Sequence, residues 1–227
     1  MRSQLSLKRG ESIPVDAQLI RDLRKLVSQG EGDHLEFKAK ANHPEKIARS
    51  LCAFANGSGG RLLLGVLDNG EITGVRYPDE EAQSVTRLLR SCRPSIKFKV
   101  SFISLSEKRS VVLFEVRASN RKPVVLKLDK GQAYYRFGDQ CIQAGPVMTE
   151  VMKRRTQAQG ELITFGDEEK EICRILSVGQ PYGINEIKNL AGSNLPNLQK
   201  ILVKLVSSGV VRIMPGSAQE KFKMNLY

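Results

Sequence analysis

Hydrophobic residues along the first two thirds of the chain follow two different periods. A spacing of three and four residues predicts helices over residues 14–29, 43–56, 78–92 and 146–155. Alternation, or a short unbroken apolar run, predicts strands over residues 35–37, 61–66, 96–105, 110–116 and 132–137. Because helices and strands do not alternate strictly, the pattern favours an α+β fold over a doubly wound parallel sheet.

The strand predicted at 35–37 has apolar and charged residues in alternation. We expect Leu35 and Phe37 to point inward, and Glu36 and the following Lys38 to point outward. The strand predicted at 61–66 is apolar almost throughout, so we expect it to be buried.

Two further patterns concern turns and strand faces. Asp68-Asn69-Gly70 predicts a hairpin turn that leads into a strand at 71–75. In the strand at 96–105, alternation turns Lys97 and Lys99 outward and gives this strand a basic outer face.

The pattern changes character in the last third of the chain. Residues 156–166 lack a clear period and are predicted to be a linker. Beyond them, the pattern predicts three helices and then two strands, over residues 167–176, 184–192, 195–209, 210–214 and 221–226. This order is the winged-helix layout, a variant of the helix-turn-helix. Its expected core consists of Ile172, Ile175, Leu176, Ile187, Leu190, Leu198, Ile201, Leu202 and Leu205.

The chain therefore has two expected domains. A mixed α/β domain is predicted at 1–155, the linker at 156–166, and a small winged-helix domain at 167–227.

Charge is distributed unevenly between these parts. The 227 residues include 36 Lys and Arg against 24 Asp and Glu, a formal net charge of +12. Residues 1–166 hold 28 of these cations and 18 of these acids, a net of +10, which leaves +2 for residues 167–227. A basic field attracts phosphate backbones, so the composition predicts DNA or RNA as the partner and assigns most of the attraction to the larger part.

Composition also argues against several other classes of protein. No apolar run approaches the roughly 18 residues of a membrane span, so we expect no membrane partner. The basic N-terminus lacks the apolar region of a secretory signal, which favours a cytoplasmic location. Two His and four scattered Cys make a zinc site improbable; the cysteines are Cys52, Cys92, Cys141 and Cys173.

A run of motifs at 31–75 resembles the signature of the Schlafen-type AlbA-like domain family. The matching pieces are E-x4-E-F-K, a helix that ends in C-A-F-A-N, a Gly-Gly turn, a strand that ends in G-V, and D-N-G-x-I-x-G-V. Residues 120–123 (NRKP), 134–140 (YYRFGDQ) and Ala144 resemble later motifs of the family, so the resemblance covers residues 12–155. It implies a DNA-binding domain of the kind found in transcriptional regulators, commonly followed by a winged helix.

The same resemblance implies a second hypothesis. In animal Schlafen proteins that resemble this domain, three carboxylates form a metal-assisted endoribonuclease site. Glu31 and Glu36 match its E-x4-E element, and Asp68 is the best match for the third carboxylate. Carboxylate oxygens suit Mg²⁺ or Mn²⁺, which can neutralise charge at a phosphodiester. Leu67 stands where the family often has a further acid, so we favour binding without cleavage.

Candidate contacts to nucleic acid follow from exposed basic and amide side chains. In the larger domain they are Lys38, Lys97, Lys99, Arg121, Lys122, Arg136, Lys153 and Arg154. The third helix of a winged helix would read bases, and there the candidates are Asn197, Lys200 and Lys204. Helix-turn-helix readers address paired half-sites, which predicts a homodimer.

Three functions remain open from the sequence. We favour a nucleic-acid-binding transcriptional regulator that needs no cofactor for binding. The alternatives are the Mg²⁺- or Mn²⁺-dependent endoribonuclease and, more weakly, a protein-interaction module, because winged helices also bind proteins. The Gly57–Gly60 region lacks the spacing of a phosphate-binding P-loop and is better interpreted as a compact connection from helix to strand.

Overall fold

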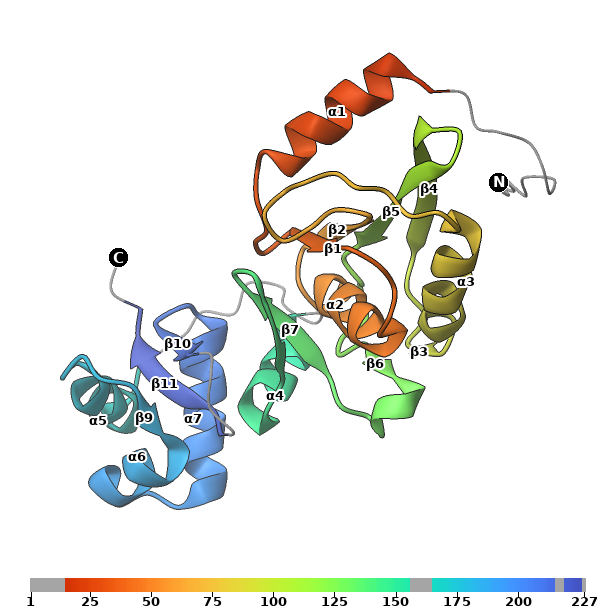
Figure 1. Cartoon of the computed structure of the whole chain (residues 1–227). Helices are drawn as coiled ribbons and strands as arrows, with labels where there is room; N and C mark the ends of the chain where they lie inside the picture. The colour runs from red at the N-terminus through yellow and green to blue at the C-terminus, as the bar shows by residue number, and fades with distance from the viewer. Residues whose placement is uncertain (1–14, 156–164, 215–218, 226–227) are drawn as a thin grey trace.

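The computed structural model describes residues 15–155, 165–214 and 219–225 of the chain. In Figure 1 the N-terminal part is a four-stranded sheet with helices on both faces, and the C-terminal part has three helices and a small sheet. The predicted α+β class is therefore confirmed. Of the predicted linker, only Phe165 and Gly166 fall within the described residues.

The central sheet has the strand order β1-β2-β5-β4. Its strands are β1 (Leu35–Lys38), β2 (Gly59–Leu64), β5 (Arg109–Arg117) and β4 (Phe98–Ser106). β1 runs parallel to β2, and the other neighbours are antiparallel. The parallel pair is connected by α2 (Pro44–Asn56), because parallel strands need a crossover.

Helix α1 (Ala17–Val27) covers part of one face of this sheet. The carboxylate of Asp16 caps the helix by accepting hydrogen bonds from the N–H groups of Gln18 and Leu19. The apolar side of α1 packs on the side chains that the strands turn toward it, which include Leu35, Phe37, Leu63, Ile103 and Val111.

Helices α2 and α3 (Pro78–Leu89) cover the opposite face and bury the main core. Both begin with a proline in the first turn, where the missing N–H costs no hydrogen bond. The predicted apolar stripe of α2 is confirmed, since Ile47, Leu51 and Phe54 are all buried.

Several short elements complete the N-terminal part, and some of them pack against α2. They are β3 (Cys92–Arg93) paired with β6 (Val125–Leu126), the 3₁₀ turn η1 (Lys127–Asp129), and the hairpin of β7 (Tyr134–Phe137) and β8 (Gln140–Gln143). The buried amide of Asn56 joins α2 to two of these segments. It donates hydrogen bonds to the carbonyls of Val124 and Tyr134 at 2.9 and 2.8 Å, and it accepts one from the N–H of Val124.

The C-terminal part consists of α5 (Asp167–Leu176), β9 (Tyr182–Gly183), α6 (Ile184–Ala191), α7 (Leu195–Ser207), β10 (Val211–Met214) and β11 (Lys221–Met224). Its three strands form one antiparallel sheet in the order β10-β11-β9. The helix α4 (Pro146–Arg155) contributes Val147 and Val151 to the core of this part and packs against α7.

Three predictions differ from the structure. Leu190 was expected in the C-terminal core but is 58% exposed, because it lies on the outer side of the short helix α6. The turn at Asp68–Gly70 forms, yet the strand expected at 71–75 makes only two isolated bridges, one of them between Val66 and Ile72. The chain bends here because Gly65 and Gly74 both have positive φ and touch, so a Cβ at Gly65 would lie 2.7 Å from the Gly74 Cα.

The third difference concerns Glu36, which does not point outward into solvent. Leu35 and Phe37 face α1 as expected, but Glu36 on the opposite face is only 5% exposed. The β7–β8 hairpin covers that side of β1 and supplies the side chain of Arg136 to Glu36. Both faces of β1 are therefore largely covered, and Lys38 at its end is half-buried.

Candidate nucleic-acid interface

The sheet face that α1 covers is open at its other end. There an open hollow of about 630 Å³ is lined by residues of β2, β4 and β5 and of the segments that lead into them. We call this hollow the basic groove; its charged residues are Arg61, Lys97, Lys99, Glu115 and Arg117, and His34 also lines it.

Strand register explains why these side chains gather. Arg61, Glu115 and Lys99 are directly opposite one another on three adjacent strands, so their side chains leave the same face of the sheet. Two residues further along β5, Arg117 is opposite Gly59 of β2, and the N–H of Arg117 donates to the carbonyl of Lys97. The same face carries Leu63 and Leu113 further along the strands, where α1 covers it. A single sheet face thus changes from apolar to basic along its length.

Two glycines that line this groove have no room for a side chain. Gly59 has a φ of +89°, and a Cβ on it would lie 2.8 Å from the carbonyl oxygen of Val116. Gly60 has its own constraint, because a Cβ there would strike the ring of Phe54 at 2.4 Å. The imidazole Nδ1 of His34 lies 2.9 Å from the Gly59 carbonyl oxygen and fixes the loop before β1 beside the groove. These contacts agree with the interpretation of the Gly-Gly segment as a compact connection.

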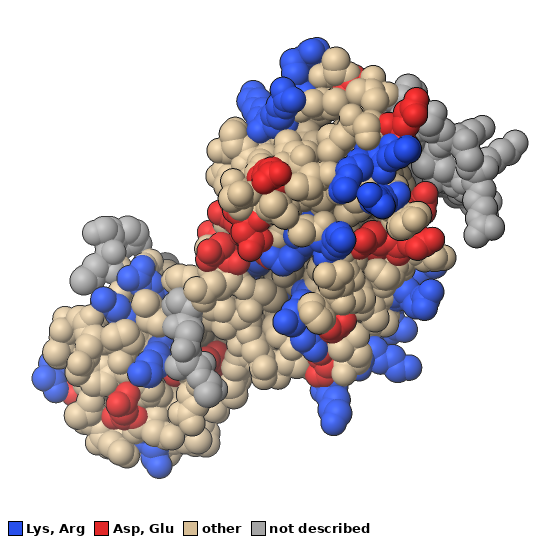
Figure 2. All heavy atoms as spheres, viewed as in Figure 1, with Lys and Arg blue, Asp and Glu red and all other residues tan. Residues whose placement is uncertain are grey.

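The groove holds four Lys and Arg side chains but only one carboxylate. Lys99 lies 3.7 Å from Glu115 in an exposed pair, with 66% and 41% of the two side chains accessible. Arg61, Lys97 and Arg117 form no ion pair with any described residue and are exposed. Figure 2 shows that Lys and Arg occupy several places on the visible face of the N-terminal part, with Asp and Glu grouped between them. An excess of unpaired cations in a hollow suits a phosphate backbone.

Sequence reasoning found two of the four groove cations. Lys97 and Lys99 were predicted from the alternation along one strand, and both side chains do point outward. Arg61 and Arg117 were missed, because only the pairing of β2, β5 and β4 brings them beside those lysines. Their proximity depends on the cross-strand register, which cannot be read from any single segment of the sequence.

The predicted acidic cluster has a different character. Glu36 is held by two cations: one carboxylate oxygen is 2.5 Å from Lys38 Nζ, and the other accepts a hydrogen bond from Arg136 Nη1. Glu31 accepts a hydrogen bond from the N–H of Phe37 at 2.7 Å and lies 3.9 Å from the same Lys38 Nζ. Glu31 therefore sits on the loop before β1, as the resemblance requires, but both carboxylates point into a network of internal partners.

Arg136 was predicted to contact nucleic acid, and its surroundings do not permit this. Its side chain is only 3% exposed, donates to Glu36 and to the carbonyl of Gly32 at 2.8 Å, and stacks over the ring of Phe54. Arg136 fixes the β7–β8 hairpin onto β1 and α2. Lys38 is likewise held between Glu31 and Glu36 and donates to the Phe37 carbonyl.

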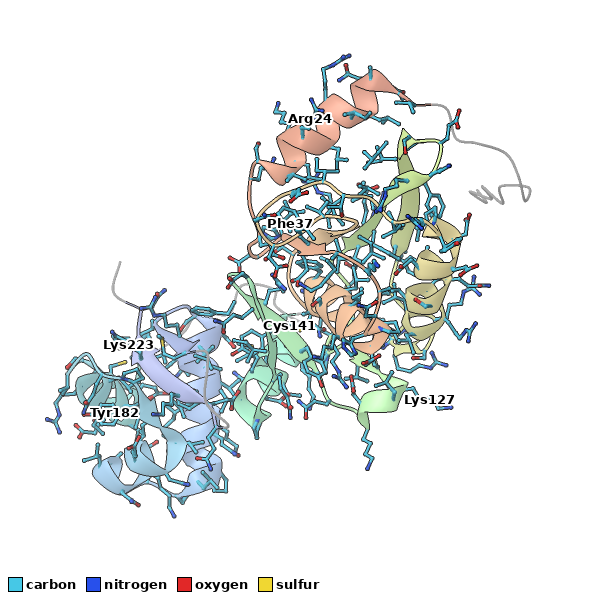
Figure 3. All side chains as sticks on the ribbon, viewed as in Figure 1. Arg24, Phe37, Lys127, Cys141, Tyr182 and Lys223 are labelled. Carbon is cyan, nitrogen blue, oxygen red and sulfur yellow. The ribbon has the colours of Figure 1, made fainter. Side chains whose placement is uncertain are left out.

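Asp68 does not complete a metal site with the two glutamates. Among the residues that the structure describes, no group of three or more His, Cys, Asp and Glu is arranged to hold a metal ion. Asp68 lies in the turn after β2 and lines a separate hollow with Arg24 of α1 and Phe37. Figure 3 labels Arg24 and Phe37. Burial raises the pKa of the Glu31 carboxyl above its ordinary value, and the charges of Glu36 and Asp68 raise it further, against the hydrogen bond from Phe37 and the charge of Lys38.

The remaining predicted contacts lie on three other elements. Arg121 is exposed, and Lys122 Nζ donates to the Gly57 carbonyl at 2.7 Å, which ties this loop to the end of α2. On α4, Lys153 pairs with Glu150 at 3.0 Å, and Arg154 is exposed. The candidates on α7 also differ among themselves: Lys200 is exposed, whereas Asn197 and Lys204 bond to carboxylates of α5.

A sequence model described as Schlafen, AlbA_2 matches residues 31–145, which is half of the chain. The chain belongs to the Schlafen AlbA_2 family. The match includes β1, β2, β4 and β5 and so the whole basic groove.

One solved structure is also similar to this chain. It is the crystal structure of the DIP2311 protein from Corynebacterium diphtheriae, with 18% sequence identity and a TM-score of 0.42. The match covers 70% of this chain and 38% of that protein, so the chain spans well under half of its length.

Within the described residues, no helix is both long and apolar enough to cross a bilayer.

Proposed function

We propose that this chain is a DNA-binding transcriptional regulator whose Schlafen AlbA_2 domain holds the phosphate backbone. The observation that carries the proposal is the basic groove, where Arg61, Lys97, Lys99 and Arg117 line one hollow with Glu115 as its only carboxylate. Cations fixed on strands keep their spacing without a ligand, so they bind a backbone without first having to be ordered.

The division of the chain is part of this proposal. Residues 1–155 form the nucleic-acid-binding domain, 156–166 a linker, and 167–227 a winged helix. The support for the last is the order of three helices followed by the β10–β11 hairpin, with β9 completing the sheet. The predicted homodimer belongs to the same proposal, because paired operator half-sites need two copies.

The contacts of Glu36 do not favour the endoribonuclease hypothesis. Both oxygens of Glu36 already have a cationic partner, so a divalent cation would have to compete with Lys38 and Arg136 for this carboxylate. In a cleavage assay with RNA and Mn²⁺ we expect intact RNA. Cleavage that Glu36→Ala abolishes would replace the regulator with the nuclease.

The proposal is tested by the salt dependence of binding. A labelled DNA duplex and a labelled RNA of the same length are titrated with the full chain between about 50 and 200 mM salt. Each phosphate contact contributes a slope of about −0.9 in log affinity against log salt on duplex DNA, so Lys97→Ala with Arg117→Ala should flatten the slope by about 1.8.

Lys170→Ala is the matched control. Lys170 is an exposed cation on α5 that pairs with Asp167 at 3.2 Å, so its removal should leave the slope unchanged. Equal slopes for the groove variant and the wild type would overturn the groove as the binding surface. No binding of either nucleic acid at the lowest salt would overturn the proposed function and leave the protein-interaction module as the better hypothesis.

A further inference from the structure

The third helix of the C-terminal part, α7, is covered on two sides. Its first apolar face, with Leu198, Leu202 and Leu205, packs into the core with α5 and α6. A second face carries Val203 and Val206, which are 3% and 5% exposed, and this face lies toward α4. Figure 1 shows α4 beside part of α7. The second half of α7 is therefore buried between these two sides, whereas Leu195, Pro196 and Lys200 near its start are exposed.

Polar side chains at the edge of α7 are also engaged. The Asn197 amide donates to both carboxylate oxygens of Glu168 at 3.0 Å, and Lys204 Nζ lies 2.5 Å from an oxygen of Glu169. Both acids belong to α5, so these two candidate readers hold helices together. Lys200 is the remaining exposed candidate of the three.

The C-terminal sheet holds α4 in place. Glu220, just before β11, accepts hydrogen bonds from the N–H groups of Val147 and Met148 at 3.0 and 2.8 Å. These are the first N–H groups of α4, which no partner inside the helix can satisfy. A carboxylate at a helix N-terminus is also favoured by the helix dipole. The cover over α7 is therefore fixed by a specific contact from the hairpin.

The outer face of the β10–β11 hairpin has the opposite character. Arg212 is directly opposite Lys223, and Lys221 lies two residues away on the same face. Arg212 and Lys221 are exposed, Lys223 is half-buried, and none of the three bonds to or pairs with a described residue. Figure 3 labels Lys223 on this hairpin, and Figure 2 shows blue side chains over the same region.

Such a pair of cations costs the hairpin some stability. Like charges directly opposite in a sheet destabilise the pairing, whereas an alternating pair would stabilise it. Three other cations of this part, Lys170, Arg174 and Lys204, do pair with acids. Arg212, Lys221 and Lys223 form no ion pair with a described acid, so they are available to an external anion.

We propose that the C-terminal part binds the phosphates of a nucleic acid through Arg212, Lys221 and Lys223 on the outer face of the β10–β11 hairpin, and not through α7. The inference rests on the proposed function, because it takes nucleic acid as the partner. It replaces base reading by the third helix with a second phosphate contact. The groove and the hairpin then hold one nucleic acid at two places.

The test compares two variants of the full chain in the same salt titration with duplex DNA. Arg212→Ala with Lys223→Ala should flatten the salt slope by about 1.8 and weaken binding at least tenfold at low salt. Lys200→Ala on α7 should leave both quantities unchanged. Urea unfolding checks the fold, and the double variant should be as stable as the wild type or slightly more stable, because it removes a like-charge pair.

The possible results separate a failure of this inference from a failure of the proposed function. A hairpin variant with wild-type slope, or a loss of affinity in Lys200→Ala, would overturn this inference and restore α7 as the contact. A less stable hairpin variant would show that Arg212 and Lys223 serve the fold, which also overturns it. If the groove variant loses binding and the hairpin variant does not, the proposed function is supported and this inference is overturned.

Discussion

Two charged regions lie on the central sheet, and they differ in exposure and in ion pairing. In the basic groove, Arg61 and its neighbours are exposed and mostly without internal partners. One residue further along β2, on the other face, Leu62 is opposite Glu36, whose carboxylate is 7% exposed and held by Lys38 and Arg136. The comparison teaches that the exposure of a charge, more than its sign, decides whether the chain or a ligand supplies its partner.

The physical reason is the cost of removing a charge from water. A buried carboxylate without a partner is strongly unfavourable, and here Lys38 and Arg136 offset the burial of Glu36. An exposed lysine or arginine carries no such requirement, because water solvates it. Unpaired cations can therefore be kept on a surface for a polyanion.

The largest expected effect is on the buried side of this comparison. Arg136→Met leaves Glu36 buried with Lys38 alone and removes the hydrogen bond to Gly32, so the free energy of unfolding should fall by about 3 kcal/mol. Urea unfolding measures this. Lys99→Met is the matched control, because it breaks an exposed pair and should change stability by less than about 1 kcal/mol. Equal losses of unfolding free energy in the two variants would contradict the proposed difference between the two regions.

A smaller effect is expected in the groove. Glu115→Gln removes the only groove carboxylate and releases Lys99 for a phosphate, so binding to duplex DNA should strengthen severalfold and the salt slope should steepen by up to about 0.9. Fluorescence anisotropy at a series of salt concentrations measures both. Glu150→Gln, which frees Lys153 on α4, serves as the control and should change neither. Weaker binding by Glu115→Gln would contradict the groove.

The smallest effect concerns pH and the acidic network. Burial raises the pKa of Glu31 above 4.5, so its folded form takes up a proton more readily than its unfolded form. The resulting stabilisation is present below pH 4.5 and is lost as pH rises through the folded pKa. Glu31→Gln keeps an acceptor for the Phe37 N–H and should flatten this decline in urea unfolding at a series of pH values. A steeper decline in the variant would show that the pKa of Glu31 is lowered.

Periodic segments were predicted well from the sequence. The stripe of α2 and the alternation of β4 each follow from local spacing, and the structure confirms both. Asn56 shows the limit, because the sequence marks it only as the end of the C-A-F-A-N helix motif, yet its amide makes three hydrogen bonds to residues 68 and 78 positions away. No local pattern marks such a partner.

The candidate site divides in the same way. Lys97 and Lys99 could be predicted because a strand turns alternate residues to one face. Arg61 and Arg117 could not, since their place beside those lysines depends on which strands pair and in which register. Arg136 was assigned to the surface because its partner Glu36 is 100 residues away in the chain.

The sequence by itself determined the period of each element, the excess of positive charge in the larger part and the motifs that resemble the Schlafen AlbA-like family. Only the tertiary structure decided which charges were buried and paired, which remained open in the groove and on the hairpin, and that α4 covers α7. The reason is range: periodicity and propensity act over a few residues, whereas burial depends on segments that the fold brings together from distant parts of the chain.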